Sequence, residues 1–319
     1  MPLAATGDLI AEAAAQHRAV AAFNVITLEH AEAIAEGAEA AGSPVILQIS
    51  ENAVAYHRGR PRPIARAAAE VADQAAVPVS LHLDHVQSTE LLHRAADCGF
   101  SSAMFDAARL PYTENLAATR AAVVWAHERG LWLEAELGQV GGKNGEPPLN
   151  AHAPGARTDP EEARSFVAAT GVDALAVAVG TSHAMTSRDA VIDHELLGGL
   201  RAAVPVPLVL HGSSGASDEE LARAVAGGIR KVNIGTALNI AMTGAIRERL
   251  AQDDRGVDPR RYLADGRDAM ARTVTRLMAV LAPGPGRCAG YRHPCGRGCG
   301  AAAPPGCGAA ARVRPGGGG

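Results

Sequence analysis

The feature that most constrains the fold of this 319-residue chain is a regular alternation of two kinds of segment. Short apolar runs rich in β-branched residues alternate with Ala-rich stretches whose apolar residues recur at helical spacing. Strands that alternate with helices pair in parallel, and eight such units close into a (β/α)₈ barrel, which commonly takes roughly 250 residues. The sequence therefore predicts a single α/β barrel whose strands cover residues 20–24, 45–50, 79–84, 102–105, 131–137, 174–179, 208–211 and 231–234.

Helix-terminal residues frame several of the intervening stretches. Asp159-Pro160 and Ser217 precede acidic residues, as at a helix start, while Gly42 and Gly171 follow helical patterns, as at a helix end. The alternative is an open, doubly wound sheet. That fold favours a Gly-x-Gly-x-x-Gly turn after the first strand, and residues 24–27 (Asn-Val-Ile-Thr) are not one.

Composition narrows the function classes. The chain is 47% apolar but only 3% aromatic, and its formal charge of −4 gives no reason to expect a nucleic-acid partner. No apolar run approaches the roughly 20 residues that span a bilayer. Asp8 and Glu12 near the N-terminus do not fit the basic-then-apolar layout of a signal peptide. We therefore expect a cytoplasmic enzyme that binds neither nucleic acid nor membrane.

The last stretch of the chain differs in composition from the rest. Residues 283–319 are rich in Gly, Pro, Ala and Arg, lack acidic residues, and contain four of the five cysteines, at spacings that match no zinc ribbon or finger. We interpret residues 1–282 as the barrel and residues 283–319 as a disordered, low-complexity tail. The alternative for the tail is an adventitious metal or redox site.

Polar residues are found at the ends of seven of the eight predicted strands. Active sites of (β/α)₈ barrels lie at the C-terminal ends of the strands, and buried polar groups are costly unless they are paired or used. Three of the residues are histidines, which are zinc ligands when neutral. The residues are Asn24, Gln48, Ser50, Asp84, His85, Glu134, Glu136, His183, His211, Asn233 and Thr236.

Six short motifs carry a family resemblance over roughly residues 1–280. In chain order, each at a predicted strand end, the chain resembles the class II (zinc-dependent) fructose-bisphosphate and tagatose-bisphosphate aldolases. The Glu-Ala-Glu-Leu-Gly-Gln pattern is similar to that of the shorter, tagatose-type branch. The motifs are Ala22-Phe23-Asn24, His82-Leu-Asp84-His85, Glu134-Ala-Glu136-Leu-Gly138, Gly180-Thr-Ser-His183, His211-Gly-Ser-Ser-Gly215 and Lys231-Val-Asn233-Ile-Gly-Thr236.

The resemblance implies a catalytic zinc ion and a proton-transfer residue. His85, His183 and His211 match the family's zinc ligands, and Glu136 matches a carboxylate that serves as an alternate or outer ligand. Asp84 matches the acid/base that takes the C4 hydroxyl proton during cleavage. The alternative for Asp84 is a partner that orients a histidine.

Two more residues lie on the same strand faces as these groups. Glu134 is two residues before Glu136, so it shares a face with it and is expected to support it. His82 is two residues before Asp84. We interpret it as a buried histidine that is either structural or in contact with a residue that binds the metal ion.

The strand-5 loop, residues 138–158, departs from the family. Long loops at this end of a barrel are often lids, and the alternative is a disordered insertion. The family's loop carries Gly-Gly-x-Glu, whose glutamate moves the proton at C3 of dihydroxyacetone phosphate. Here Asn144 occupies that position, so either Glu146 substitutes after a two-residue slip or the step is impaired. A second departure is Ala184, where a glycine usually approaches the phosphate and a monovalent cation.

The resemblance also implies substrate contacts. Small residues near helix starts suit phosphate, and Gly212, Ser214 and Thr236 match the family's phosphate site. Ordinary turn and helix-cap roles are the alternative. The other implied contacts are Asn24, Ser50 and Asn233 with the substrate and Arg260 with the distal phosphate, across a dimer interface.

These residues together predict a zinc-dependent aldolase of glycolysis or related carbohydrate metabolism. It would reversibly cleave fructose 1,6-bisphosphate to dihydroxyacetone phosphate and glyceraldehyde 3-phosphate, as a dimer or tetramer. The chain has only two lysines, Lys143 and Lys231, which argues against an imine route. The alternatives are a tagatose 1,6-bisphosphate aldolase, a zinc hydrolase, and a catalytically impaired sugar-phosphate-binding relative.

Overall fold

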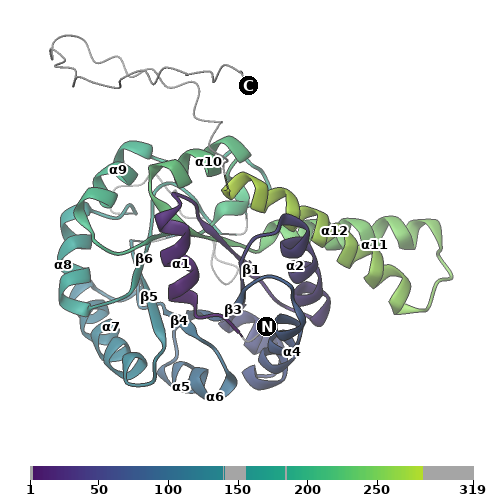
Figure 1. The fold of residues 1–319 in the computed structure, drawn as a ribbon, viewed down its shortest axis with the longest axis horizontal. Helices are drawn as coiled ribbons and strands as arrows, with labels where there is room; N and C mark the ends of the chain where they lie inside the picture. The colour runs from purple at the N-terminus through teal and green to yellow at the C-terminus, as the bar shows by residue number, and fades with distance from the viewer. Residues whose placement is uncertain (1–2, 139, 141–155, 184, 283–319) are drawn as a thin grey trace, which may run out of the picture. The chain divides into compact units, whose positions relative to one another are not determined.

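The computed structural model describes residues 3–138, 140, 156–183 and 185–282. Their eight strands form a closed parallel barrel in which each strand pairs with its neighbours in sequence and β8 pairs with β1 (Figure 1). The predicted (β/α)₈ barrel is thereby confirmed. The strands are β1 (Val20–Asn24), β2 (Val45–Ser50), β3 (Val79–Val86), β4 (Ser102–Phe105), β5 (Trp132–Leu137), β6 (Ala174–Val177), β7 (Leu208–Leu210) and β8 (Ile229–Ile234).

Helices surround the barrel and close one of its ends. Residues 89–98, between β3 and β4, form two short helices that are divided at Arg94. The helices are α1 (Thr6–Ala15), α2 (Leu28–Ala41), α3 (Glu51–Tyr56), α4 (Pro61–Gln74), α5 (Thr89–His93), α6 (Ala95–Cys98), α7 (Tyr112–His127), α8 (Pro160–Thr170), α9 (His194–Ala203), α10 (Asp218–Gly227), α11 (Thr236–Gln252) and α12 (Pro259–Leu281), with a 3₁₀ turn, η2 (Ser213–Gly215).

The helix-terminal signals in the sequence act as expected. Asp159 accepts hydrogen bonds from the amides of Glu161 and Glu162 at the start of α8, and Gly171 ends this helix in the left-handed conformation. Gly42 ends α2 in the same way. Capping residues thus mark both ends of α8 and the end of α2.

The main apolar core lies between the strands and the surrounding helices. Side chains such as Leu81, Leu83 and Ile34 are completely buried there. A smaller cluster lies where α1 covers one end of the barrel (Figure 1), with Ile10 packed near Ala22 and Ile46. The apolar filling of the barrel interior is small, so much of that interior is left to polar side chains.

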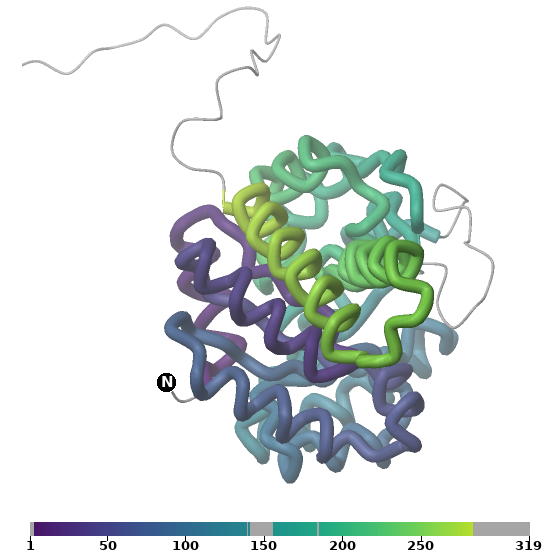
Figure 2. Tube along the Cα trace, turned by 90° about the vertical axis from the view of Figure 1, so that its right-hand side faces the viewer, coloured from purple at the N-terminus to yellow at the C-terminus, as the bar shows by residue number. Residues whose placement is uncertain are grey.

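Helices α11 and α12 form a hairpin, and α12 lies alongside α2 (Figure 2). Gly37 of α2 allows the close approach, because a Cβ at this position would lie 2.6 Å from the Cβ of Val274. Arg267 of α12 also donates to Glu32 of α2 at 2.9 Å. These contacts attach the last helix to the first βα unit.

Among the helices of the described residues, none has the length and hydropathy needed to cross a bilayer. The predicted boundary between residues 282 and 283 stays a prediction, because the predicted tail, residues 283–319, lies outside the described residues.

Candidate active site and metal centre

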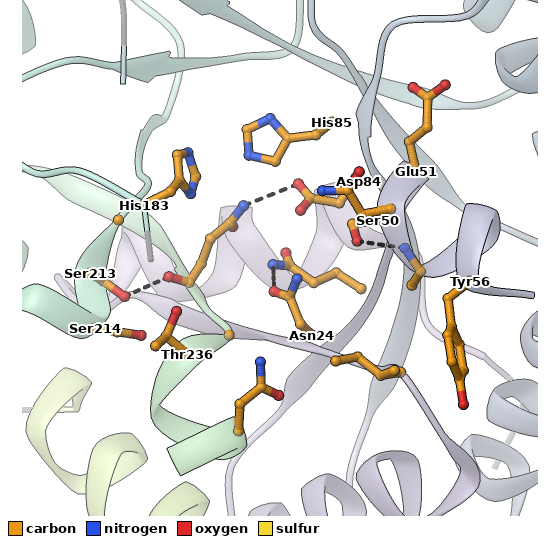
Figure 3. Close-up of a pocket in the computed structure, with 18 of the residues that line it drawn as sticks. Asn24, Ser50, Glu51, Tyr56, Asp84, His85, His183, Ser213, Ser214 and Thr236 are labelled. Atoms are coloured by element: carbon orange, nitrogen blue, oxygen red, sulfur yellow. Dashed lines mark hydrogen bonds between the residues drawn. The ribbon is translucent and has the colours of Figure 1, made fainter. Parts of the chain in front are cut away.

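A pocket of about 670 Å³ opens at the C-terminal ends of the strands. Figure 3 shows His85, His183 and Asp84 around one part of it. Ser213, Ser214 and Thr236 lie on the side of His183, and Ser50 and Tyr56 lie on the opposite side.

Four side chains with metal-ligand atoms converge beside this pocket. The ligand atoms of His85, Glu136, His183 and His211 all lie within 4.8 Å of one another, and these four residues are called the metal-ligand cluster below. The centroids of the imidazole rings are 4.9 Å apart for His85 and His183, 4.7 Å for His85 and His211, and 5.7 Å for His183 and His211. The structure therefore brings together the four predicted metal-site residues, which come from four different strands or the loops that follow them.

His85 reaches the cluster because β3 is irregular at its end. Its φ is +51°, a left-handed value that is uncommon for a residue other than glycine. The register between β3 and β4 also shifts after Leu83. A regular strand would direct Asp84 and His85 to opposite faces, whereas this irregularity lets both line the pocket.

A second carboxylate orients His85. Asp106 follows β4 directly, and its Oδ2 lies 2.9 Å from Nδ1 of His85. Nε2 of His85 is buried and has no hydrogen-bond partner among the described residues, so it is available to a metal ion. Our sequence interpretation missed Asp106, although a polar residue directly after a buried strand was the signal used at the other strand ends.

His211 lies between two buried carboxylates. Its Nε2 is 2.9 Å from Oε1 of Glu134, and its Nδ1 is 3.2 Å from Oε2 of Glu136. Burial, the largest effect, lowers the pKa of His211, but its hydrogen bonds to both glutamates and their charges together raise that pKa to about 9. A metal ion bound here would have to displace this proton.

Nitrogen and carboxylate donors at this spacing suit a zinc ion. Zinc is bound in proteins by imidazole nitrogen and carboxylate oxygen, commonly by three or four such groups. The available Nε2 of His85 and the buried carboxylate of Glu136 are consistent with that chemistry. The described residues therefore fit a divalent metal ion of this class.

Asp84 is buried next to the metal-ligand cluster and lines the pocket. Its Oδ1 accepts a hydrogen bond of 3.2 Å from Nδ2 of Asn233. Burial, the largest effect, raises the pKa of Asp84, but the positive charges of His85, Lys231 and His211 outweigh burial and lower it. The carboxylate is therefore ionised near neutral pH and able to accept a proton.

A buried polar layer lies beneath the pocket. Lys231 donates to Oε2 of Glu134 at 2.7 Å and to Oδ1 of Asn233 at 2.8 Å. His82 is fully buried with its Nδ1 2.8 Å from Ser102 Oγ, and burial together with the charge of Lys231 lowers its pKa to about 3. His82 is thus a neutral core histidine. Lys231 is not part of the pocket lining, so within the described chain no lysine faces the pocket.

The residues expected to contact substrate phosphate form one side of the pocket. Gly212 has a φ of +65°, and a Cβ there would lie 2.5 Å from the carbonyl oxygen of Ser182. Ser214 accepts a hydrogen bond from the amide of Ala237 in the first turn of α11, and Thr236 begins that helix. A helix start with small neighbours is suited to an anion.

The other predicted substrate residues differ in position. Asn24, Ser50 and Asn233 line the pocket. Arg260 does not: its side chain is 90% exposed and pairs with Asp258 at the start of α12. Its predicted role across an interface between two copies stays a prediction.

Some features of the site escaped prediction or cannot be placed. Tyr56 and Asn239 line the pocket without having been predicted, because neither follows a strand. Glu146, Asn144 and Ala184 lie outside the described residues.

Comparisons with known proteins show which family the chain resembles. The chain matches the family model described as "Fructose-bisphosphate aldolase class-II" over residues 4–283. The YdjI aldolase of Escherichia coli K12 is 33% identical, with 88% of this chain and 97% of that chain covered at a TM-score of 0.76. A protein of Coccidioides immitis assigned as a fructose-1,6-bisphosphate aldolase is 32% identical, with 87% and 96% covered and a TM-score of 0.78.

A third solved structure supports the fold alone. The fructose-bisphosphate aldolase of Campylobacter jejuni is 23% identical, with 88% of this chain and 95% of that chain covered and a TM-score of 0.75. The family match spans the whole barrel, including all four residues of the metal-ligand cluster and Asp84. The chain belongs to the class II fructose-bisphosphate aldolase family.

Proposed function

We propose that this chain is a zinc-dependent aldolase that reversibly cleaves fructose 1,6-bisphosphate to dihydroxyacetone phosphate and glyceraldehyde 3-phosphate. The observation that supports this most strongly is the convergence of His85, Glu136, His183 and His211 beside a pocket that Asp84 also lines. Ligands for a metal ion and a candidate base, the two components that such a reaction needs, are thus neighbouring side chains.

The four clustered residues would hold the metal ion. When bound, a divalent ion supplies Lewis-acid polarisation of the ketose C2 carbonyl and stabilises the negative charge left after C3–C4 cleavage. The rest of the chemistry falls to residues of the chain.

Asp84 takes the proton of the C4 hydroxyl as the C3–C4 bond breaks, and returns it during synthesis. Its lowered pKa keeps the carboxylate ionised until the proton arrives. Asn233 donates an amide N–H to Asp84 and holds that carboxylate at the pocket wall. Ionisation and orientation are the two properties that a general base needs.

The phosphate next to the reacting carbons would be held by Gly212, Ser214 and Thr236. Main-chain N–H groups and hydroxyls at the start of α11 supply donors there, and glycine at position 212 allows close approach. Asn144 occupies the position of the family's loop glutamate, so we assign the exchange of the proton at C3 to Glu146, two residues later in the same loop.

A coupled assay for triose phosphates tests the proposal. Fructose and tagatose 1,6-bisphosphates should be compared, each with and without a metal chelator, followed by zinc restoration. We expect cleavage of fructose 1,6-bisphosphate that the chelator abolishes and zinc restores. Exclusive cleavage of the tagatose substrate identifies the alternative aldolase. Inorganic phosphate without triose phosphates indicates a hydrolase, and binding without turnover indicates the impaired relative.

A further inference from the structure

Lys231 is the only lysine of the described residues, and it lies beneath the pocket rather than in its wall. Its side chain extends from β8 and is fully buried. The aldol chemistry above does not use it. A buried ammonium is tolerated only where its donors are paired, so its two partners, Glu134 and Asn233, point to its role.

The first partner, Glu134, contacts a metal-ligand histidine. One of its oxygens accepts from Lys231, and the other lies 2.9 Å from Nε2 of His211. A carboxylate can only accept, so Nε2 carries the hydrogen. The unprotonated nitrogen of a neutral His211 is then Nδ1, the atom that faces Glu136 in the metal-ligand cluster.

The opposite tautomer is the alternative. Asn233 Nδ2 lies 3.1 Å from Nε2 of His211, so an unprotonated Nε2 could accept from this amide. In that arrangement two lone pairs, on Nε2 and on Oε1 of Glu134, would face each other at 2.9 Å. The carboxylate held by Lys231 therefore selects the tautomer with hydrogen on Nε2.

The second partner, Asn233, contacts the proposed base. Its Oδ1 accepts from Lys231, which leaves its Nδ2 to donate to Asp84 at 3.2 Å. An amide of the opposite orientation would direct its oxygen at the Asp84 carboxylate. Because lysine can only donate, it decides which way this amide lies.

We propose that Lys231 is a positioning residue that sets two groups of the metal site at once. Through Glu134 it makes His211 present Nδ1 to the metal ion, and through Asn233 it directs an N–H group to Asp84. The proposal rests on the proposed function, because it assumes a metal ion at the cluster.

Glu134→Gln is the most informative variant because it keeps the shape of the side chain. Lys231 would attract the amide oxygen, so the amide nitrogen would face Nε2 of His211. Nε2 of His211 must then be unprotonated, and its hydrogen moves to Nδ1, the atom to which the metal ion binds. We expect metal affinity to fall about 10–100-fold, as is usual when the partner of a metal ligand is lost.

The double variant Lys231→Met/Glu134→Gln gives a prediction of opposite sign. Without the ammonium, the amide is free to turn its oxygen toward Nε2–H of His211. The double variant should therefore bind metal more tightly than Glu134→Gln alone. A merely structural lysine predicts the reverse, since a second buried change would add to the damage.

Arg230→Met is the matched control. Arg230 is the neighbour of Lys231 on β8, is also buried, and donates to the carbonyl oxygens of Val225 and Ile229. Its replacement removes a buried cation from the same strand without touching the metal-ligand cluster. We expect a lower unfolding temperature with unchanged metal affinity.

Two measurements give the result. Competition between the full-length protein and a chelator, with Co²⁺ absorption as the signal, yields metal affinity for each variant. Nitrogen NMR of the zinc-loaded wild-type protein shows which ring nitrogen of His211 carries hydrogen. The proposal expects hydrogen on Nε2 and zinc on Nδ1.

Three outcomes overturn the proposal: hydrogen on Nδ1 in the wild-type protein, metal affinity of Glu134→Gln equal to that of Arg230→Met, or a double variant no better than Glu134→Gln. The first needs no variant, so it decides the matter even where a variant does not fold. A protein that binds zinc through Nδ1 of His211 but cleaves no ketose bisphosphate supports the positioning role and contradicts the proposed function.

Discussion

Replacing Asp84 by asparagine separates proton transfer from metal binding. Asp84 is 2% exposed and accepts one hydrogen bond, from Asn233 at 3.2 Å. Asparagine keeps the size of the side chain and an oxygen for that bond, so fold and metal-ligand cluster should persist. What is lost is a group that can accept the C4 hydroxyl proton. General-base catalysis contributes about 10²–10⁴-fold, or roughly 3–5 kcal/mol of activation free energy.

The assay compares cleavage with a partial reaction. Cleavage of fructose 1,6-bisphosphate by metal-replete Asp84→Asn should slow about 10²–10⁴-fold. Exchange of the C3 hydrogen of dihydroxyacetone phosphate with deuterated water involves no C4 hydroxyl, so it should change much less. Asp173→Asn is the control, because Asp173 is a carboxylate that pairs with His127, and neither residue lines the pocket. Normal turnover, or equal loss of both reactions, in metal-replete Asp84→Asn refutes the assigned role.

The converse variant, Glu146→Gln, should suppress C3 exchange, and unchanged exchange excludes Glu146 as the loop base. His183→Ala should bind zinc at least ~100-fold more weakly, since loss of a ligand's partner alone costs about 10–100-fold; metal analysis after dialysis checks this. Asp106→Ala, which removes the partner of His85, should weaken zinc about 10–100-fold in chelator competition. Gly212→Ala should lose at least ~1–2 kcal/mol of stability in denaturant titration, because its φ is +65°, and should raise KM; an unchanged KM argues against phosphate binding there.

Much of the barrel was predictable because its determinants are local. Strand and helix periodicity, together with residues such as Asp159 and Gly171, give eight repeating units that only a few folds accommodate. The polar strand ends were predictable for the same reason, since parallel strands bring their C-terminal ends to one rim. Periodicity also placed Glu134 and Glu136 on one face of β5.

Contacts across the barrel could not be predicted in this way. Lys231 and Glu134 are 97 residues apart, and nothing in either local sequence indicates that they pair. The left-handed backbone of His85 was equally hidden, because alternation alone would turn this side chain away from the face of Asp84. These features depend on how distant strands are placed, and β-bulges of this kind have no simple sequence signal.

The charges of the buried groups in and around the metal-ligand cluster give a physical reason for a divalent ion at this place. Four carboxylates, of Asp84, Asp106, Glu134 and Glu136, are buried here with the ammonium of Lys231. These buried groups together carry more negative than positive charge, and the raised pKa of His211 is one result of that imbalance. A divalent ion that displaces the His211 proton adds one positive charge more than it removes. The same electrostatics that hold a proton on His211 therefore favour its exchange for a dication.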